Sequence, residues 1–267
     1  MVHTLKALAL DLDGTLIGTD ECISRGTLKA VSELAKSIPI FICTGREKRE
    51  VQRFGQQLNL TQPQICDNGA LVVDPCSNWK PIWHRTLVHS DSVGLINLIT
   101  EKKFPFIATS LNGSIYDISD DIEGEFGRIS ILDIPEREAE EIIREYSRVP
   151  GVNAVKAWLP YNRLWAVDFT AEGVDKGSGV KVVGDLLNLD VRYMACVGDS
   201  HNDLAMFDAC GLSIAMGNSP ESVKSKADFV VGTVETDGLV DAIEEIIVPL
   251  LQDGLGKANF PSGHRLV

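Results

Sequence analysis

Two aspartates close to the start of the chain are the first residues whose types and spacing could carry out chemistry. Asp11 and Asp13 stand in the sequence Asp-Leu-Asp-Gly, directly after the apolar run Leu5–Leu10. In a parallel sheet covered by helices, ligands bind just beyond the carboxyl ends of the strands. Two carboxylates at that edge can act as a nucleophile, as a general acid and base, or as ligands of a cation.

Later segments bring more polar residues to the same predicted edge. Thr44 follows the apolar run Ile38–Cys43, and Asp199 follows the run Tyr193–Val197. Lys176 stands at the start of a helical pattern, and two polar residues open the helix after Asp199. The residues expected at this edge are Asp11, Asp13, Thr44, Lys176, Asp199, Asn202 and Asp203.

Carboxylates that gather at one edge repel one another. At ~4 Å and an effective dielectric constant near 20, each pair of like charges costs about 4 kcal/mol. Either the pKa values of the carboxyl groups rise, or a cation lies among them. Oxygen ligands without His or Cys favour Mg²⁺ over Zn²⁺, and Mg²⁺ held by few protein ligands also binds phosphate oxygens of a substrate. The cluster therefore indicates phosphoryl chemistry.

Phosphoryl transfer would give each of these side chains a task. A carboxylate beside Mg²⁺ can attack phosphorus and form an aspartyl-phosphate. Asp13, two residues after Asp11, can protonate the leaving oxygen and later deprotonate water. Thr44 can donate a hydrogen bond to a phosphoryl oxygen, and Lys176 can neutralise the charge that develops there.

The elements that must position these residues alternate between strand and helix in the first and last thirds of the chain. Near-continuous apolar runs separated by helical patterns predict an α/β fold, doubly wound, with a mainly parallel sheet buried on both faces. The expected strands are Leu5–Leu10, Ile38–Cys43, Gln64–Cys66, Tyr193–Val197, Leu212–Ala215 and Phe229–Val231. The expected helices span about 25–36, 47–58, 177–187, 202–209 and 238–251, and another starts at Ser219-Pro220-Glu221.

The middle of the chain, from about Trp79 to Thr170, has longer and partly alternating apolar runs, which predict an inserted α+β unit with a mainly antiparallel sheet. Asn112-Gly113 predicts a hairpin turn. The runs are Phe106–Thr109, Ser114–Ile118, Ile129–Ile134, Ala154–Leu159 and Leu164–Phe169, with helical patterns near 90–103 and 135–148. We expect residues 1–79 and 174–252 to form the core, residues 80–173 the insertion, and residues 253–267 a tail.

Two groups of residues in the insertion have ordinary structural explanations. Four tryptophans are expected in the hydrophobic interior of the insertion, with a platform for substrate as the alternative. They are Trp79, Trp83, Trp158 and Trp165. The acidic stretch from Asp117 to Glu125 is expected to form a solvated loop.

The composition bounds the class of protein and its partners. Of 267 residues, 44% are apolar and 24% are charged, so the chain can bury a sizeable core. The net charge of −13 argues against nucleic acid or an anionic membrane as the main partner. The sequence shows no apolar stretch of roughly 20 residues, no secretory signal and no Cys-x-x-Cys pair. We expect a cytoplasmic protein with reduced thiols, a monomer or a small homo-oligomer.

The motifs resemble those of one enzyme family. Asp11-Leu-Asp-Gly-Thr-Leu resembles the first motif of the haloacid dehalogenase (HAD) superfamily, Thr44-Gly-Arg the second, Lys176-Gly the third, and Gly198-Asp-Ser-His-Asn-Asp the fourth. Asp67-Asn-Gly and the later Ala-Met-Gly-Asn sequence at 215–218 resemble the Cof-type, or IIB, subfamily with a C2-type cap. All four motifs occur in the family's order, with an insertion of cap size between the second and third.

This resemblance implies a role for each candidate residue. Asp11 would be the nucleophile and a ligand of Mg²⁺, Asp13 the general acid and base that also offers its backbone carbonyl to the metal, and Asp199 a metal ligand. Asp203 would orient the metal shell or Lys176. The residues expected to bind phosphate are Thr44, Gly45, Lys176 and Asn202. Arg46 and Asn68 are candidates for substrate contact, but Arg46 could instead pair with an acidic side chain, and Asn68 could serve only its turn.

Together these features predict Mg²⁺-dependent hydrolysis of a small organic phosphomonoester, such as a phosphosugar or a similar metabolite, through an aspartyl-phosphate. Two alternatives remain open from the sequence. One is a phosphomutase or phosphotransferase of the same fold, in which a sugar hydroxyl replaces water as the acceptor. The other is a non-enzymatic, metabolite-binding protein built on the same fold.

Overall fold

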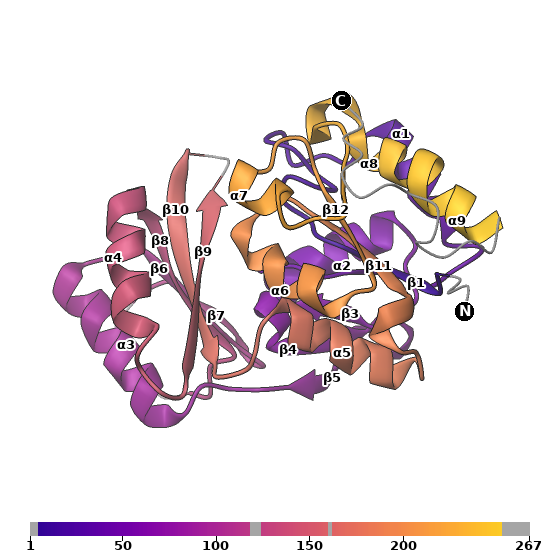
Figure 1. The fold of residues 1–267 in the computed structure, drawn as a ribbon. Helices are drawn as coiled ribbons and strands as arrows, with labels where there is room; N and C mark the ends of the chain where they lie inside the picture. The colour runs from indigo at the N-terminus through magenta and orange to yellow at the C-terminus, as the bar shows by residue number, and fades with distance from the viewer. Residues whose placement is uncertain (1–4, 118–123, 160–161, 253–267) are drawn as a thin grey trace.

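A five-stranded parallel sheet organises the core of the protein, which the computed structural model describes over residues 5–117, 124–159 and 162–252 (Figure 1). Its strands lie in the order β13-β12-β11-β1-β2, so the first strand of the chain lies in the interior of the sheet. The strands are β1 (Ala7–Leu10), β2 (Ile40–Ile42), β11 (Met194–Gly198), β12 (Leu212–Ala215) and β13 (Phe229–Val230). The prediction of a parallel, doubly wound core is confirmed.

Alternating side chains of the strands fill two hydrophobic layers, one on each face of the sheet. Leu8 and Leu10 pack on the face covered by α1 (Arg25–Leu34) and α2 (Lys48–Gln57). Ala7 and Ala9 pack on the opposite face. The helices of that opposite face are α5 (Lys176–Leu186), α6 (Leu204–Ala209) and α7 (Glu221–Lys224). Both faces are therefore buried, which explains the near-continuous apolar strands.

A small antiparallel sheet extends the core beyond β2. It contains β3 (Gln64–Cys66), β4 (Leu71–Asp74) and β5 (Lys80–His84), in that order. A parallel bridge between Cys43 and Ile65 joins it to the end of β2. We did not predict β5, because it begins with exposed Lys80-Pro81 rather than with an apolar run. The short apolar run of β4 was also left without an assignment.

The inserted unit, which we call the cap, runs from α3 (His89–Lys102) to β10 (Leu164–Ala171). Its antiparallel sheet has the order β7-β6-β8-β10-β9. Helices α3 and α4 lie on the outer side of this sheet, and the other side faces the core (Figure 1). The remaining cap elements are β6 (Phe106–Ser110), β7 (Gly113–Ile115), β8 (Arg128–Ile134), α4 (Glu136–Tyr146) and β9 (Val152–Leu159).

Several local predictions need correction. The hairpin turn between β6 and β7 is Leu111-Asn112 rather than Asn112-Gly113, because Ser110 pairs with Gly113. The helix expected at 202–209 begins with a 3₁₀ turn, η4, at 201–203. The helix expected at 238–251 is divided into α8 (Gly238–Asp241), a π-helical stretch (Ala242–Ile247) and α9 (Val248–Gln252). The expected tail and most of the acidic stretch lie outside the described residues.

Among the described helices, none is both long and apolar enough to cross a membrane.

Trp79 corrects the expectation that the tryptophans fill the interior of the insertion. It is 5% exposed and belongs to the hydrophobic layer of the core that also contains α2. Its indole lies against Gly55 of α2, where an added Cβ would come within 2.4 Å of Cη2. Gly55 therefore makes room for a large rigid side chain.

We expect Gly55→Ala to lower the free energy of unfolding by about 1–3 kcal/mol relative to Gly94→Ala, because the new methyl group must displace the Trp79 indole. Gly94 in α3 is the matched control, since a Cβ there meets no atom within 4 Å. Removing that helical glycine should stabilise the protein by up to about 1 kcal/mol. Urea denaturation of both variants measures the difference, and equal midpoints would contradict the packing described for Trp79.

Candidate active site

The loop after β1 brings the first motif against the end of β11. Asp11 is 3% exposed, and its backbone N–H donates to the carbonyl of Val197 at 3.0 Å. Gly14 has a φ of +77°, and a Cβ at this position would lie 2.2 Å from Oδ2 of Asp199. Only glycine fits this conformation and this close approach without strain. The glycine of the motif thus lets the loop contact Asp199 directly.

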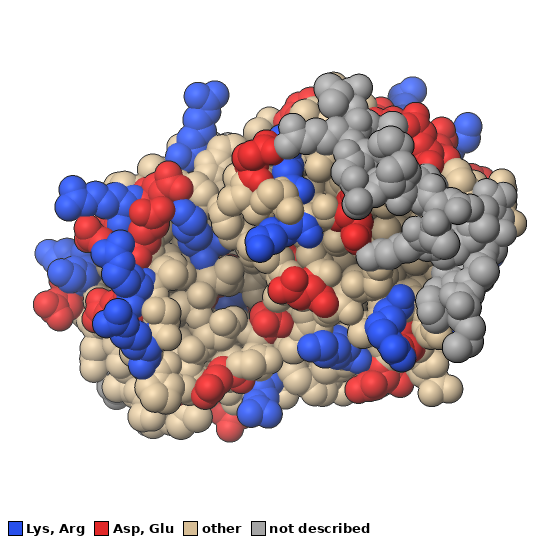
Figure 2. All heavy atoms as spheres, in the orientation of Figure 1, with Lys and Arg blue, Asp and Glu red and all other residues tan. Residues whose placement is uncertain are grey.

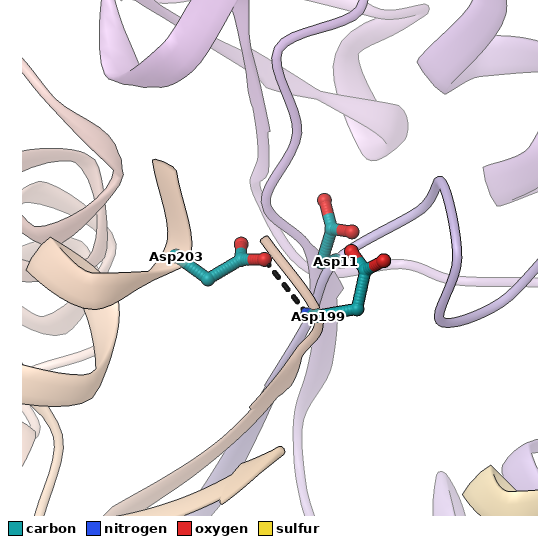
Figure 3. A group of neighbouring side chains, drawn as sticks. All are labelled: Asp11, Asp199 and Asp203. Carbon is teal, nitrogen blue, oxygen red and sulfur yellow. Dashed lines mark hydrogen bonds between the residues drawn. The ribbon is translucent and has the colours of Figure 1, made fainter. Parts of the chain in front are cut away.

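The loop after β11 is held by Asp203. Its Oδ2 accepts hydrogen bonds from the backbone N–H groups of Asp199 and Ser200, both at 2.9 Å. Asp203 is fully buried and stands at the end of the 3₁₀ turn His201–Asp203, just before α6. These two bonds fix the direction in which Asp199 leaves the strand, as the dashed line in Figure 3 shows for Asp199.

The charged side chain of Lys176 connects the loop after β1 to the loop after β11, because it contacts a carboxylate from each. It is the first residue of α5, whose N-terminus is capped by Asp175, and its side chain is 1% exposed. The ammonium group donates to Oδ1 of Asp11 and to Oδ1 of Asp203, each at 2.6 Å. Burial alone would lower the pKa of Lys176, but the carboxylates of Asp11 and Asp203 raise it above its ordinary value. Lys176 therefore remains charged.

Three carboxylates lie close together around this buried ammonium group, which contacts two of them. Ligand atoms of Asp11, Asp199 and Asp203 lie within 4.8 Å of one another. Figure 3 shows that the carboxylates of Asp11 and Asp199 face each other while Asp203 approaches from the other side. Burial, together with Asp203, raises the pKa of Asp11 to about 7, and burial and the neighbouring Asp11 also raise the pKa of Asp199. Such an excess of buried negative charge favours binding of a cation.

The hydrogen bonds of these carboxylates leave Oδ1 of Asp199 free for a cation. Oδ2 of Asp199 accepts from the amide of Asn218 at 3.0 Å, but its Oδ1 is buried without a hydrogen-bond partner. Both oxygens of Asp203 are already engaged, by Lys176 and by the backbone. Asp11 and Asp199 are thus the side chains best able to bind a hard divalent cation.

Asp13 lies in the same loop but outside this cluster, because Arg46 holds it. Nη2 of Arg46 is 2.6 Å from Oδ1 of Asp13, and Nε is 2.9 Å from Oδ2. Arg46 also reaches Glu21 at 3.0 Å and Glu50 at 3.4 Å. Burial opposes the charge, but the bonds to Asp13 and Glu21 raise the pKa of Arg46. Of the two possibilities left open by the sequence, Arg46 pairs with acidic side chains in this structure.

Thr44 and Gly45 bring the second motif against Asn68. Thr44 is 1% exposed, and its backbone carbonyl accepts from the N–H of Asn68 at 3.0 Å. A Cβ at Gly45 would lie 3.1 Å from Nδ2 of Asn68, so this glycine packs on the asparagine side chain. Gly69, at φ +96°, allows the same turn to lie against the carbonyl of Asp175 at the start of α5. The turn at Asn68 is therefore packed between the second and third motifs.

A chain of buried polar side chains links this turn to the cap. The amide of Asn202 donates to Asn68 at 3.2 Å, and the amide of Asn68 donates to Asp168 at 2.5 Å. Arg128 of β8 lies 3.2 Å from both Asp168 of β10 and Asp67 of the core. Burial raises the pKa of Asp67 to about 6, although Arg128 opposes this shift. Asn68 and Asn202 are thus held in a connection between the core and the cap.

A cavity of about 860 Å³ lies between the core and the cap, in front of the aspartate cluster. Most of the predicted site residues line it, namely Asp11, Asp13, Thr44, Gly45, Arg46, Asp199 and Asn202. Lys176 and Asn68 line a smaller space of about 120 Å³, which Asn202 also lines. The structure therefore brings residues of all four motifs together. Lys176 and Asn68 line the smaller space rather than the main cavity.

Sequence reasoning missed several residues of this site. Asn218 connects the carbonyl of Gly14 to Asp199, with both contacts at 3.0 Å. The Ala-Met-Gly-Asn sequence that contains Asn218 contributed to the family resemblance, but no role was predicted for Asn218 itself. The cap also contributes Arg128 and Asp168 to the cavity. Trp158 and Trp165 are among its lining residues too, although Trp165 also packs against the hydrophobic cluster of the cap, as expected. No sequence pattern pointed to Arg128 or Asp168, because an amphipathic strand allows two registers.

Known proteins resemble this chain along most of its length. The sequence profile of the haloacid dehalogenase-like hydrolase family matches residues 8–149 and 161–243. A 5-amino-6-(5-phospho-D-ribitylamino)uracil phosphatase of Bacillus subtilis is 28% identical over 251 residues, which cover 91% of this chain and 96% of that protein. A phosphoglycolate phosphatase of Methanosarcina acetivorans is 24% identical over 247 residues, covering 90% and 95%. The solved structure of a HAD subclass IIB sugar phosphatase has a TM-score of 0.76 at 24% identity, and the match covers 90% of this chain and 98% of that one.

We expect Lys176→Met to lower the free energy of unfolding by about 3–5 kcal/mol, because the variant leaves buried carboxylates without their cation. Lys36→Met is a matched control, since Lys36 pairs with Glu33 and both side chains are exposed. Exposed pairs of this kind contribute about 1 kcal/mol or less. Chemical denaturation of both variants at neutral pH measures the losses, and similar losses would show that Lys176 does not balance the aspartates.

Proposed function

The chain belongs to the haloacid dehalogenase-like hydrolases, and we propose that it is a Mg²⁺-dependent phosphatase that hydrolyses a small organic phosphomonoester through an aspartyl-phosphate. The observation that carries this proposal is the buried contact of Lys176 with Asp11 and Asp203, which fixes a carboxylate at the floor of a large cavity. The names of the curated relatives, which are phosphatases of small phosphorylated molecules, support the reaction class.

Mg²⁺ fits the donors that the chain offers. Asp11 and Asp199 would hold it by their side chains, and Asp13 by its backbone carbonyl, as the family resemblance implies. The unpartnered Oδ1 of Asp199 and the absence of His or Cys from the described carboxylate group support this choice of ion. When bound, Mg²⁺ would neutralise negative charge on the phosphoryl oxygens and on the surrounding carboxylates.

Asp11 would be the nucleophile. Lys176 holds its Oδ1, so the carboxylate is fixed at the end of β1 and pays little orientational cost in the attack on phosphorus. A bond forms between a carboxylate oxygen and phosphorus while the bond from phosphorus to the alcohol oxygen breaks. Water then attacks the aspartyl-phosphate, which releases inorganic phosphate and restores the carboxylate of Asp11.

Asp13 would be the general acid and base of both steps. It would give a proton to the leaving alcohol oxygen in the first step and take one from water in the second. Its carboxylate contacts Arg46 in this structure, so the contact must loosen when Asp13 carries the proton. Arg46 would then still face Glu21 and Glu50, which reduces the cost of loosening it from Asp13.

The remaining candidate residues would bind the phosphoryl group and the rest of the substrate. Thr44, Gly45, Lys176 and Asn202 surround the position of the phosphoryl group in the arrangement that the family motifs imply. Arg46 lines the cavity in front of Asp13 and would contact the substrate there. Asn68, which is held by Asn202 and Asp168, would act at a greater distance by orienting Asn202.

The surface of the molecule supports a small ligand rather than a polyanion as the partner. On the face drawn in Figure 2, Lys and Arg are interspersed with Asp and Glu and form no continuous basic field. The whole chain has a net charge of −13. Binding of nucleic acid depends on a concentrated basic surface. A phosphorylated metabolite needs only the local positive charge of Lys176 and of the bound cation.

We expect Asp11→Asn to abolish phosphate release and to leave the fold intact, because an amide cannot attack phosphorus and is similar in size to the carboxyl group. The measurement is phosphate release from a panel of sugar phosphates, phosphoglycerates, nucleotides and cofactor phosphates. Asp185→Asn, on the exposed side of α5, is the control and should keep the wild-type rate. A near-normal rate in Asp11→Asn would exclude this nucleophile, and transfer to a sugar hydroxyl without free phosphate would exclude hydrolysis.

Removal of divalent cations should also abolish turnover. After dialysis against a chelator we expect phosphate release to fall to the background rate, because Asp11 and Asp199 would then repel both each other and the substrate phosphate. Addition of Mg²⁺ should restore the rate. Circular dichroism before and after dialysis controls for unfolding, and an undiminished rate in the chelated protein would contradict a role for the cation.

A further inference from the structure

The side of the cap sheet that faces the core carries a row of apolar side chains. Alternation along β10 places Ala166 on the same side as Asp168, whose carboxylate contacts the core. Ala157 of β9 is directly opposite Ala166 and shares this side. Ile107 of β6 and Asp168 both pair with Ser130 of β8, so Ile107 lies on this side as well.

Leu132 of β8 completes this row. It stands two residues after Ser130, so alternation along the strand places it on the same side of the sheet. Each apolar residue of the row lines the main cavity, which Asp11 and Asp13 also line. We call the row the cap wall, and its residues are Ile107, Leu132, Ala157 and Ala166.

The cap wall takes no part in the hydrophobic interior of either unit. The other side of the sheet, with Val167 and Phe169, packs with α3 and α4 in the hydrophobic cluster of the cap. Among the described residues, the hydrophobic clusters of the core and of the cap contain no member of the cap wall. Ile107, Leu132 and Ala157 are nevertheless half-buried. The cap wall is therefore apolar surface that a ligand in the cavity can cover, with a gain from the hydrophobic effect.

The side chains of the cap wall favour a flat group. Ala157 and Ala166, on neighbouring strands, carry only methyl groups, while Ile107 and Leu132 carry longer, branched side chains. The alanines thus leave space close to the backbone of the sheet, beside a higher apolar edge, and a planar ring can fill such a space. A polyol would instead bring hydroxyl groups to a surface that offers them no hydrogen bonds.

The size of the cavity supports a leaving group that extends beyond the phosphoryl group. At about 860 Å³ the cavity lies in the upper part of the range of roughly 300–1,000 Å³ that holds ligands of drug size. A leaving group of two or three carbons would fill little of this space. Because Asp11 and the cap wall line the same cavity, a substrate with its phosphorus at Asp11 can direct a larger leaving group toward the cap wall.

We propose that the leaving group of the substrate is an alcohol that carries a planar ring, and that one face of this ring packs on the cap wall. The proposal rests on the phosphatase function proposed above and adds the substrate class. It makes Ile107 and Leu132 determinants of specificity, because they contact the ring and not the phosphoryl group. Phosphate esters of simple sugars and polyols are accordingly the poorer substrates.

Two phosphate esters that differ by a planar ring test this inference. Ribose 5-phosphate has no base, and uridine 5′-phosphate adds an uncharged planar ring to the same phosphorylated sugar. For the wild-type protein with Mg²⁺ we expect kcat/KM for uridine 5′-phosphate to be higher by about tenfold or more, the scale of burying the apolar surface of one side chain. An equal or higher kcat/KM for ribose 5-phosphate would overturn the proposal, as would phosphate release only from esters without a ring.

Matched variants assign the preference to the cap wall. Leu132→Asn and Ile107→Asn each put a polar amide in the wall and should reduce the ratio of kcat/KM for uridine 5′-phosphate over ribose 5-phosphate by about tenfold, mainly through KM. Leu132→Met and Ile107→Val keep the wall apolar and should retain most of the ratio. Turnover of ribose 5-phosphate should change little in these variants, which checks that the aspartates remain in place.

A ratio that both Asn variants leave unchanged would overturn the proposal even though phosphate is still released. Absence of phosphate release from every ester would instead refute the phosphatase function itself.

Discussion

The site depends on one buried ammonium group. Lys176 is 1% exposed, and a charge so far from water is tolerated only because Asp11 and Asp203 each lie 2.6 Å from it. These residues come from three distant parts of the chain, so the contact requires β1 and β11 to be neighbours in the sheet and α5 to begin beside them. The fold thus brings the carboxylates together, and the ammonium group makes their proximity tolerable. Asp199, which Lys176 does not contact, keeps the unpaired oxygen that a cation can use.

Contacts between the core and the cap are largely polar, in contrast to the interior of each unit. Arg128 joins Asp67, Asn68 joins Asp168, and hydroxyl groups of the cap donate to Glu47 at the start of α2. The cap has a hydrophobic cluster of its own, which includes residues of α3, α4 and the cap strands. Water can replace polar contacts of this kind at a much lower cost than it can enter a hydrophobic interior. Separation of the two units to admit a substrate would therefore not require either of them to unfold.

Much of this arrangement could be predicted from the sequence, because it follows from where strands end. Asp11, Thr44 and Asp199 each follow an apolar run, and parallel strands place such residues at one edge. The pairing of Arg46 with Asp13 and Glu21 could not be predicted, because these carboxylates reach it only after the chain has folded. The sequence prediction also misplaced Trp79, which lies in the connection between β4 and β5, where apolar residues do not alternate clearly. Predictions failed where long-range packing, rather than local pattern, decides the outcome.

The connection from the cap back to the core is short. Strand β10 ends at Ala171, and α5 begins with Lys176, so only residues 172–175 separate the cap sheet from the buried ammonium group. The cap holds this link at one point, since Thr170 and Asn153 of the cap both donate to the carbonyl of Val174, at 2.6 and 2.9 Å. The link is therefore too short and too well anchored to absorb a large movement of the cap. Any tilt of the cap sheet pulls directly on the first turn of α5, so the position of the cap and the electrostatics around the nucleophile are coupled through the backbone itself.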